Sequence, residues 1–373
     1  MTLRANGRAR AREIGIVLGA LEPGPKNAIT DVAGVRVGQT TLISGEGELV
    51  VGEGPVRTGV TVIIPRDDIG KHPLFAGFHS LNGNGEMTGT HWIAESGLLT
   101  TPIAITNTHS VGAVHEAIIR RSVRVDKDWR LQFSLPVVCE TYDGVLNDIN
   151  GFHVRAEHVD AAMDVASDGA VEEGTVGGGT GMLCHEFKGG IGTSSRIVPT
   201  ASGEYTVGVL VQANYGRRSD LRIDGVPVGR ELGFDKVPPP ISREKEAGSI
   251  IIVVATDAPL LPHQCRRMAQ RASLGLARLG GISGDSSGDI FIAFSTGNTD
   301  VERHDGREPL PVLAFPNSEI SKLFAGAVEA TEEAIVNALC MATDTTGADN
   351  RTAYAIPLGQ LTEIMAKYNR LAS

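Results

Sequence analysis

The sequence predicts a layered α+β fold in which helices cover β-sheets from the outside. Three observations favour this class. Residues 250–256 form a mainly β-branched run without alternation, as in a strand covered on both faces. Residues 196–212 hold two apolar stretches around a short polar turn, as in a hairpin. Residues 262–279 and 320–339 carry apolar side chains at helical spacing.

Composition narrows the class of protein further. The 373 residues suffice for one large core or for two or three average domains. The 46 glycines cluster beside apolar runs, which indicates tight turns and close backbone approaches. The formal net charge of −10 argues against nucleic acid as a partner, because phosphate binding requires clustered lysine and arginine.

Cysteine spacing and hydropathy predict the compartment. The four cysteines are widely separated and form no C-x-x-C pair, so we expect reduced thiols, no disulfide framework and no structural metal. The N-terminus is basic but lacks the apolar segment of a signal peptide, and no run of eighteen apolar residues occurs. These features predict a soluble cytoplasmic protein that does not use a membrane.

The N-terminal half is predicted to contain three strands and two helices. Apolar runs bounded by proline, glycine or polar clusters predict strands at residues 59–65, 101–107 and 136–144. A helix over residues 111–119 follows the second strand, and a short amphipathic helix is expected at residues 157–166. Between these elements, residues 82–89 hold three glycines among polar side chains and predict a loop that could place Asn or Glu in a cleft.

Two glycine-rich segments in the middle of the chain, residues 174–181 and 188–195, are predicted to be loops. The first is no phosphate-binding loop, because Met182 follows where a P-loop requires Gly-Lys-Ser/Thr. The second leads into the hairpin. Residues 219–246 are polar and proline-rich, and they predict an exposed linker that could be cut.

The C-terminal third is predicted to hold one more strand and three helices. The helix at residues 262–279 has a basic face, which suits solvent or a subunit contact better than nucleic acid. A strand is expected at residues 289–296. Asn317 is the expected N-cap of the following long helix, and a last helix spans about residues 358–371.

Ser249 stands where the polar loop meets the strand at residues 250–256. If the chain is cut between Gly248 and Ser249, that serine carries both a hydroxyl and a free α-amine. The unperturbed pKa of such an amine is roughly 7.7–8.0, close enough to neutrality for it to act as a base. The alternative is an ordinary serine at the start of a strand, because Gly-Ser is common turn chemistry.

A second serine segment lies at residues 284–288, which match G-x-S-x-G. A nucleophile elbow requires a strand before the turn and a helix after it, and here the predicted order is the reverse. Ser287 and Asp289 are two residues apart at a strand entrance, so they share a face and could orient or relay a proton for a neighbouring hydroxyl. A Ser-Gly-Asp turn without a catalytic role remains the alternative.

Eight segments in one order resemble a known family, the self-processing serine aminopeptidases, which comprise the L-aminopeptidase/D-Ala-esterase-amidase type and the β-aminopeptidases. The resemblance covers nearly the whole length. The segments are NAITDV (27–32) with GVRVG (34–38), NGNGE (82–86), ETYDG (140–144), GGIGT (189–193), QANYG (212–216), Gly248-Ser249 with its strand, ATDAPL (255–260) and SGD (287–289).

The resemblance implies a four-layer αββα sandwich of the N-terminal-nucleophile-like type, formed by residues 1–373 as a single compact catalytic domain. It also implies a precursor that cuts itself between Gly248 and Ser249. The products are an α-chain (1–248) and a β-chain (249–373) that remain associated, and four such αβ units are expected to form a homotetramer.

The resemblance also implies roles for particular residues. Ser249 is the expected nucleophile, assisted by Ser287 and Asp289. Asn214 together with Tyr142 is expected to stabilise the oxyanion. Glu140 resembles the carboxylate that pairs with the ammonium group of the substrate, and no metal or other cofactor is implied.

The expected activity is release of unblocked N-terminal L-, D- or β-amino acids from short peptides, amides and esters through an acyl-enzyme on Ser249. One alternative is acyl transfer of the ornithine acetyltransferase type, although those enzymes use a threonine nucleophile. Another is an uncleaved, non-enzymatic scaffold. The sequence leaves open which amino acids are preferred and whether the Ser249 amine is the general base.

Overall fold

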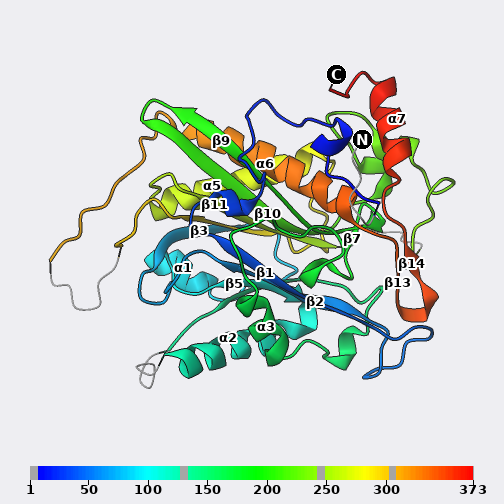
Figure 1. Cartoon of the computed structure of the whole chain (residues 1–373), viewed down its shortest axis with the longest axis horizontal. Coiled ribbons are helices and arrows are strands. Elements are labelled where there is room, and N and C mark those ends of the chain that lie inside the picture. Colours follow the sequence, from blue (N-terminus) through cyan, green and yellow to red (C-terminus); the bar gives the residue numbers. More distant parts are fainter. Residues whose placement is uncertain (1–6, 127–132, 242–247, 302–307, 373) are drawn as a thin grey trace.

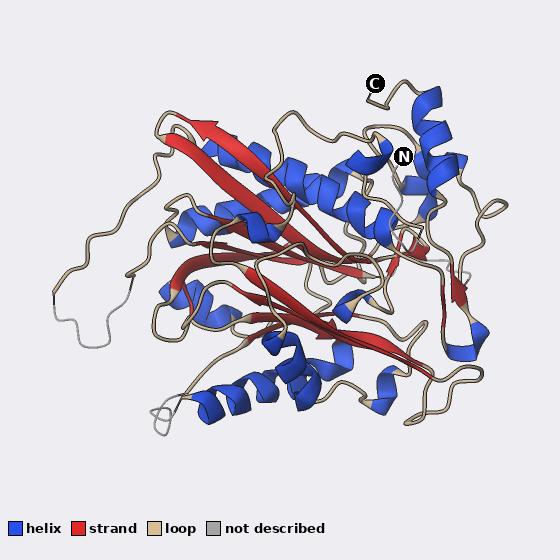
Figure 2. Cartoon of the chain, in the orientation of Figure 1, coloured by secondary structure: helices blue, strands red, loops and turns tan. Residues whose placement is uncertain are grey.

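Two β-sheets lie face to face between two layers of helices in the computed structural model, which describes residues 7–126, 133–241, 248–301 and 308–372 (Figures 1 and 2). The four-stranded sheet has the order β1 (Arg36–Ser44), β2 (Val56–Ile64), β5 (Ile103–Asn107) and β6 (Val137–Thr141). The six-stranded sheet has the order β4 (Leu98–Leu99), β3 (Leu74–Ser80), β12 (Ile290–Ser295), β11 (Ser249–Thr256), β10 (Gly203–Asn214) and β9 (Gly190–Thr200).

Each sheet is covered by its own pair of helices (Figure 1). The six-stranded sheet packs against α5 (Pro262–Arg278) and α6 (Ile320–Met341), and the four-stranded sheet packs against α2 (Val111–Val125) and α3 (Ala156–Asp164). The order of layers is therefore αββα, as the resemblance implied. The remaining α-helices and strands are α1 (Thr90–Ser96), α4 (Val228–Glu231), α7 (Leu358–Lys367), and the small ladders β7 (Leu183–Cys184) with β8 (Phe187–Lys188) and β13 (Thr345–Thr346) with β14 (Thr352–Ala353).

The central strand β11 is buried on both faces, which explains its unbroken apolar run. Ile250, Ile252 and Val254 belong to the core shared with α5 and α6. Ile251 and Val253 point the other way, into the core between the two sheets. No helix in the described part of the chain is long and apolar enough to cross a membrane.

The second glycine-rich segment is part of a strand, so its prediction as a loop was wrong. Residues 190–195 form the first half of β9, which pairs with β10 along its length. Glycine is needed at position 192 because a Cβ there would lie 1.9 Å from the carbonyl oxygen of Ala334 on α6. Gly192 thus permits close packing of α6 on the sheet, and Gly190 permits the close approach of Gly174.

The predicted linker at residues 219–246 also differs from expectation. Most of it packs on the body of the protein, because Leu221, Ile223, Val228 and Leu232 are buried in the same core as α5 and α6. Residues 242–246 of this prediction lie outside the described residues.

Two helix ends were also mispredicted. The long helix α6 begins after Glu319 rather than at Asn317, whose side-chain oxygen accepts a hydrogen bond from Gln264 on α5. The last helix ends at Lys367, short of the expected residue 371.

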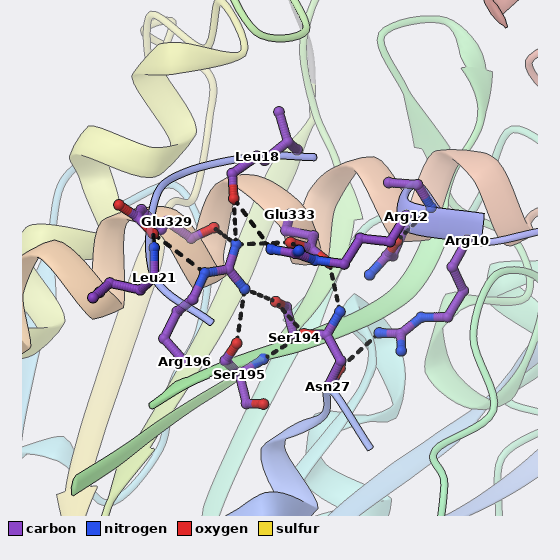
Figure 3. Close-up of polar contacts among 12 residues, drawn as sticks. Arg10, Arg12, Leu18, Leu21, Asn27, Ser194, Ser195, Arg196, Glu329 and Glu333 are labelled. Atoms are coloured by element: carbon purple, nitrogen blue, oxygen red, sulfur yellow. Dashed lines mark hydrogen bonds and ion pairs between the residues drawn. The ribbon is translucent and has the colours of Figure 1, made fainter. Parts of the chain in front are cut away.

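A buried polar network joins the N-terminal segment to β9 and α6 (Figure 3). The Arg196 guanidinium is fully buried and lies 2.7 Å from Glu333 and 3.3 Å from Glu329. Arg12 pairs with Glu333 at 2.9 Å, and the Asn27 amide donates to the same carboxylate. These contacts tie residues on the N-terminal side of Ser249 to a helix on its C-terminal side.

Candidate active site

Ser249 is the first residue of β11 and is cross-strand partner of Asn214, the last residue of β10. Its side chain is buried, with 6% of the residue exposed. The preceding Gly248 has a φ of +148°, and a Cβ there would lie 2.0 Å from the Asn214 carbonyl oxygen. Only glycine fits beside Ser249 for this reason.

Ser287, Gly288 and Asp289 face Ser249 from the entrance of β12. The Ser287 hydroxyl lies 2.7 Å from the Gly248 carbonyl oxygen and 2.7 Å from Asp289 Oδ1. The Gly288 N–H donates to Ser249 Oγ at 3.0 Å. As their spacing predicts, Ser287 and Asp289 contact one another. Ser287 contacts the Gly248 carbonyl directly, and Asp289 Oδ1 accepts from the N–H of Ile250, the residue after Ser249.

The Gly248 carbonyl, the Ser287 hydroxyl and the Asp289 carboxyl group form a row of three oxygen atoms. Two hydrogen bonds join them, and each bond needs one proton. A hydroxyl carries one proton, and both a carbonyl oxygen and an ionised carboxylate can only accept. Ser287 can therefore donate to Gly248 while keeping its second hydrogen bond only if Asp289 is protonated. Burial raises the pKa of Asp289, although its hydrogen bonds with Ser287 and with the Ile250 N–H lower it.

Asn214 is oriented by backbone groups on two sides. Its Oδ1 accepts a hydrogen bond from the Leu183 N–H at 2.8 Å, and its Nδ2 donates to the Tyr142 carbonyl at 2.9 Å. An amide nitrogen has two hydrogens, so one N–H of Asn214 remains for a further acceptor. Tyr142 itself is 47% exposed. Its hydroxyl oxygen lies beside Gly144, because a Cβ at Gly144 would be 2.4 Å from that oxygen.

Glu140 lies at the end of β6 and is only 3% exposed. Its Oε1 accepts a hydrogen bond from the Glu86 N–H at 3.1 Å, and the Thr108 hydroxyl donates to its Oε2. Burial raises the pKa of Glu140, and these two hydrogen bonds oppose the rise. A Cβ at Gly85 would lie 3.1 Å from Glu140 Oε1 and 3.0 Å from Gly288 Cα, so this carboxyl group is close to the Ser249 side of the site.

The sequence did not single out Thr108, and it indicated Asn82 only as part of the loop at residues 82–89, without a role of its own. Thr108 directly follows β5, and the parallel pairing of β5 with β6 brings it beside Glu140. Asn82 belongs to the glycine-rich loop after β3 and contacts the Ser283–Asp289 region. Among the described residues, no group of three or more His, Cys, Asp or Glu side chains could hold a metal ion.

Comparison with known proteins identifies the family of this chain. The model of the family described as Peptidase family S58 matches residues 27–353. The chain is 49% identical to the β-peptidyl aminopeptidase BapA of Sphingosinicella microcystinivorans, over 98% of this chain and 93% of that protein.

Two solved structures are similar throughout. A β-aminopeptidase from Burkholderia sp. has a TM-score of 0.89 and 51% identity, covering 96% of this chain and 99% of that one. The L-aminopeptidase D-Ala-esterase/amidase of Ochrobactrum anthropi, described as a prototype of the serine aminopeptidases with a variant of the Ntn hydrolase fold, has a TM-score of 0.91 and 44% identity, covering 97% and 99%. The chain thus belongs to peptidase family S58 and is a serine aminopeptidase with this Ntn-hydrolase-type fold.

Proposed function

We propose that the chain cuts itself between Gly248 and Ser249 and then uses Ser249 as an N-terminal nucleophile. One observation carries this proposal: the carbonyl oxygen that precedes Ser249 lies 2.7 Å from the Ser287 hydroxyl. A carbonyl held by a hydroxyl donor is polarised toward attack, and the donor stabilises the charge that develops on its oxygen.

The proposed self-cleavage proceeds by an N-to-O acyl shift. Ser249 Oγ loses its proton and attacks the Gly248 carbonyl carbon, and the negative charge goes to the oxygen beside Ser287. The C–N bond then breaks, the Ser249 nitrogen receives the proton that Oγ lost, and an ester joins Gly248 to Ser249 Oγ. Water hydrolyses the ester, which leaves a carboxylate on Gly248 and a free α-amine on Ser249.

In the cut enzyme, the α-amine of Ser249 accepts the proton of the Ser249 hydroxyl. Ser249 Oγ then attacks the substrate carbonyl carbon. The second N–H of Asn214 and the Tyr142 hydroxyl donate to the oxyanion, while Ser287 and Asp289 keep Ser249 oriented. The leaving amine or alcohol takes the proton. Water then releases the amino acid from the acyl-enzyme.

Glu140 is the proposed partner of the substrate ammonium group, so blocked N-termini are excluded. The two β-aminopeptidases are 49% and 51% identical to this chain, whereas the L-aminopeptidase D-Ala-esterase/amidase is 44% identical. We therefore propose that short peptides and amides with an N-terminal β-amino acid are the preferred substrates, ahead of those with L- or D-α residues. Acyl transfer of the ornithine type is disfavoured because Ser249 replaces the threonine nucleophile.

The proposal is tested with purified protein and its Ser249→Ala variant. Denaturing mass analysis should give fragments 1–248 and 249–373 for the wild type and one intact, inactive chain for the variant. The p-nitroanilide of β-Ala should be cleaved faster than those of L-Ala and D-Ala, and N-acetyl-β-Ala p-nitroanilide should not be cleaved. An active wild type that is wholly intact would refute the proposed processing.

The proposed assembly is a homotetramer of αβ units. It is supported by the family resemblance. Light scattering after size-exclusion chromatography measures the mass directly, and a particle with the mass of one αβ unit would contradict it.

A further inference from the structure

The loop between β3 and α1 runs alongside the turn at residues 283–289, which carries Ser287 and Asp289. The Asn82 side chain makes three hydrogen bonds with this turn. Its Nδ2 donates to the carbonyls of Ser283 at 3.2 Å and Gly284 at 2.9 Å. Its Oδ1 accepts from the Asp289 N–H at 2.8 Å. One amide therefore contacts both ends of the turn.

The turn has little support from regular structure. It follows α5 and precedes β12, and Ser283 has a φ of +52°, which an L-residue adopts at a cost. Further contacts with the same loop come from the backbone, because the N–H groups of Leu81 and Asn84 donate to the carbonyls of Asp289 and Ser287. The Asn84 side-chain amide donates one hydrogen bond, at 2.8 Å, to the backbone carbonyl of the exposed Ser286.

We infer that Asn82 is a positioning residue, which holds the 283–289 turn so that Ser287 reaches the Gly248 carbonyl and Asp289 reaches Ser287. The inference rests on the proposed function of the Gly248-Ser249 junction. Ser287 acts through contacts of 2.7 Å. A displacement of about 1 Å in such a site can lower a rate about 100-fold.

The effect of Asn82 should fall on the chemical step rather than on substrate binding. The proposed ammonium site is Glu140, which is held by the Thr108 hydroxyl and the Glu86 N–H and not by Asn82. Loss of the Asn82 amide therefore lowers kcat and slows self-cleavage, while KM changes little. A residue that served only to stabilise the fold would lower the unfolding temperature without separating kcat from KM.

The test compares Asn82→Ala with Asn84→Ala, which removes the same amide from the same loop but spares both ends of the turn. Self-cleavage is followed by electrophoresis after cell-free translation. kcat and KM are measured with β-Ala p-nitroanilide, per mole of free Ser249 amino terminus. Asn82→Ala should slow cleavage and lower kcat at least tenfold with KM within threefold, and Asn84→Ala should stay within threefold of the wild type in every value.

Any other pattern overturns the inference: an Asn82→Ala kcat within threefold of the wild type, a rise in KM that matches the fall in kcat, or an equal loss in Asn84→Ala. If Asn82→Ala does not fold, Asn82→Ser is judged by the same limits. Ser249→Ala separates this inference from the proposed function. If Ser249→Ala is active, the proposed nucleophile is refuted. If Ser249→Ala is inactive and Asn82→Ala is fully active, only the role of Asn82 is refuted.

Discussion

Removal of the Ser287 hydroxyl should nearly stop self-cleavage. In the uncut chain this hydroxyl lies 2.7 Å from the Gly248 carbonyl oxygen, where the negative charge would develop. Loss of one such donor costs a factor of about 10²–10³ in rate, or about 2.7–4 kcal/mol of transition-state stabilisation. The Ser287→Ala precursor is therefore expected to have a cleavage half-time about 100 to 1,000 times longer than that of the wild type.

The assay is timed electrophoresis after cell-free translation, with the two fragments identified by mass. Ser286→Ala is the matched control, because this neighbouring serine is exposed, and it should cut at close to the wild-type rate. Cleavage of Ser287→Ala within threefold of the wild-type rate would refute the reasoning, because the Gly248 carbonyl would then need no help from Ser287.

The rate of self-cleavage should depend on pH, because the hydrogen bonds among Gly248, Ser287 and Asp289 require a proton on Asp289. Burial raises the pKa of Asp289 above its ordinary value, so its carboxyl group stays neutral to a higher pH than an exposed aspartate. Below this raised pKa, Asp289 donates to Ser287, which can donate to Gly248. As the pH rises through it, the ionised carboxylate can only accept, so the Ser287 O–H donates to Asp289 instead of to the Gly248 carbonyl, and cleavage should slow. Asp289→Asn cannot ionise and should lose this pH dependence, and a variant with an unchanged profile would contradict the assignment.

Three further predictions concern substrate binding and stability. Glu140→Gln should raise KM for β-Ala p-nitroanilide at least about tenfold, because a neutral amide replaces the anion beside the ammonium group; an unchanged KM would exclude this residue as the ammonium site. Gly192→Ala should lower the free energy of unfolding by about 1–3 kcal/mol in urea titration, because its Cβ would lie 1.9 Å from the Ala334 carbonyl oxygen. Glu333→Ala should lower the free energy of unfolding by about 3–5 kcal/mol, because the substitution removes the carboxylate that lies 2.7 Å from the fully buried Arg196. A loss under 1 kcal/mol would show that other groups satisfy the guanidinium.

Local patterns were enough to predict the elements that carry the candidate site. The run after Ser249 predicted β11 because a strand between two apolar layers needs no polar face. The two-residue spacing of Ser287 and Asp289 predicted their contact because side chains alternate along an extended chain. The glycine-rich start of β9 misled prediction, because its glycines serve close packing rather than a turn: Gly192 admits α6, and Gly190 admits the backbone of Gly174.

The sequence by itself determined the layered α+β class and placed Gly248-Ser249 where a loop enters a buried strand, because periodicity and turn chemistry act between near neighbours. Only the tertiary structure decided which distant groups surround that junction. Asn82 meets Asp289 across 207 residues, and Thr108 meets Glu140 because β5 and β6 pair in parallel. Such contacts depend on sheet order and on the register of strands, which arise from the packing of the whole core and leave no local signal in the chain.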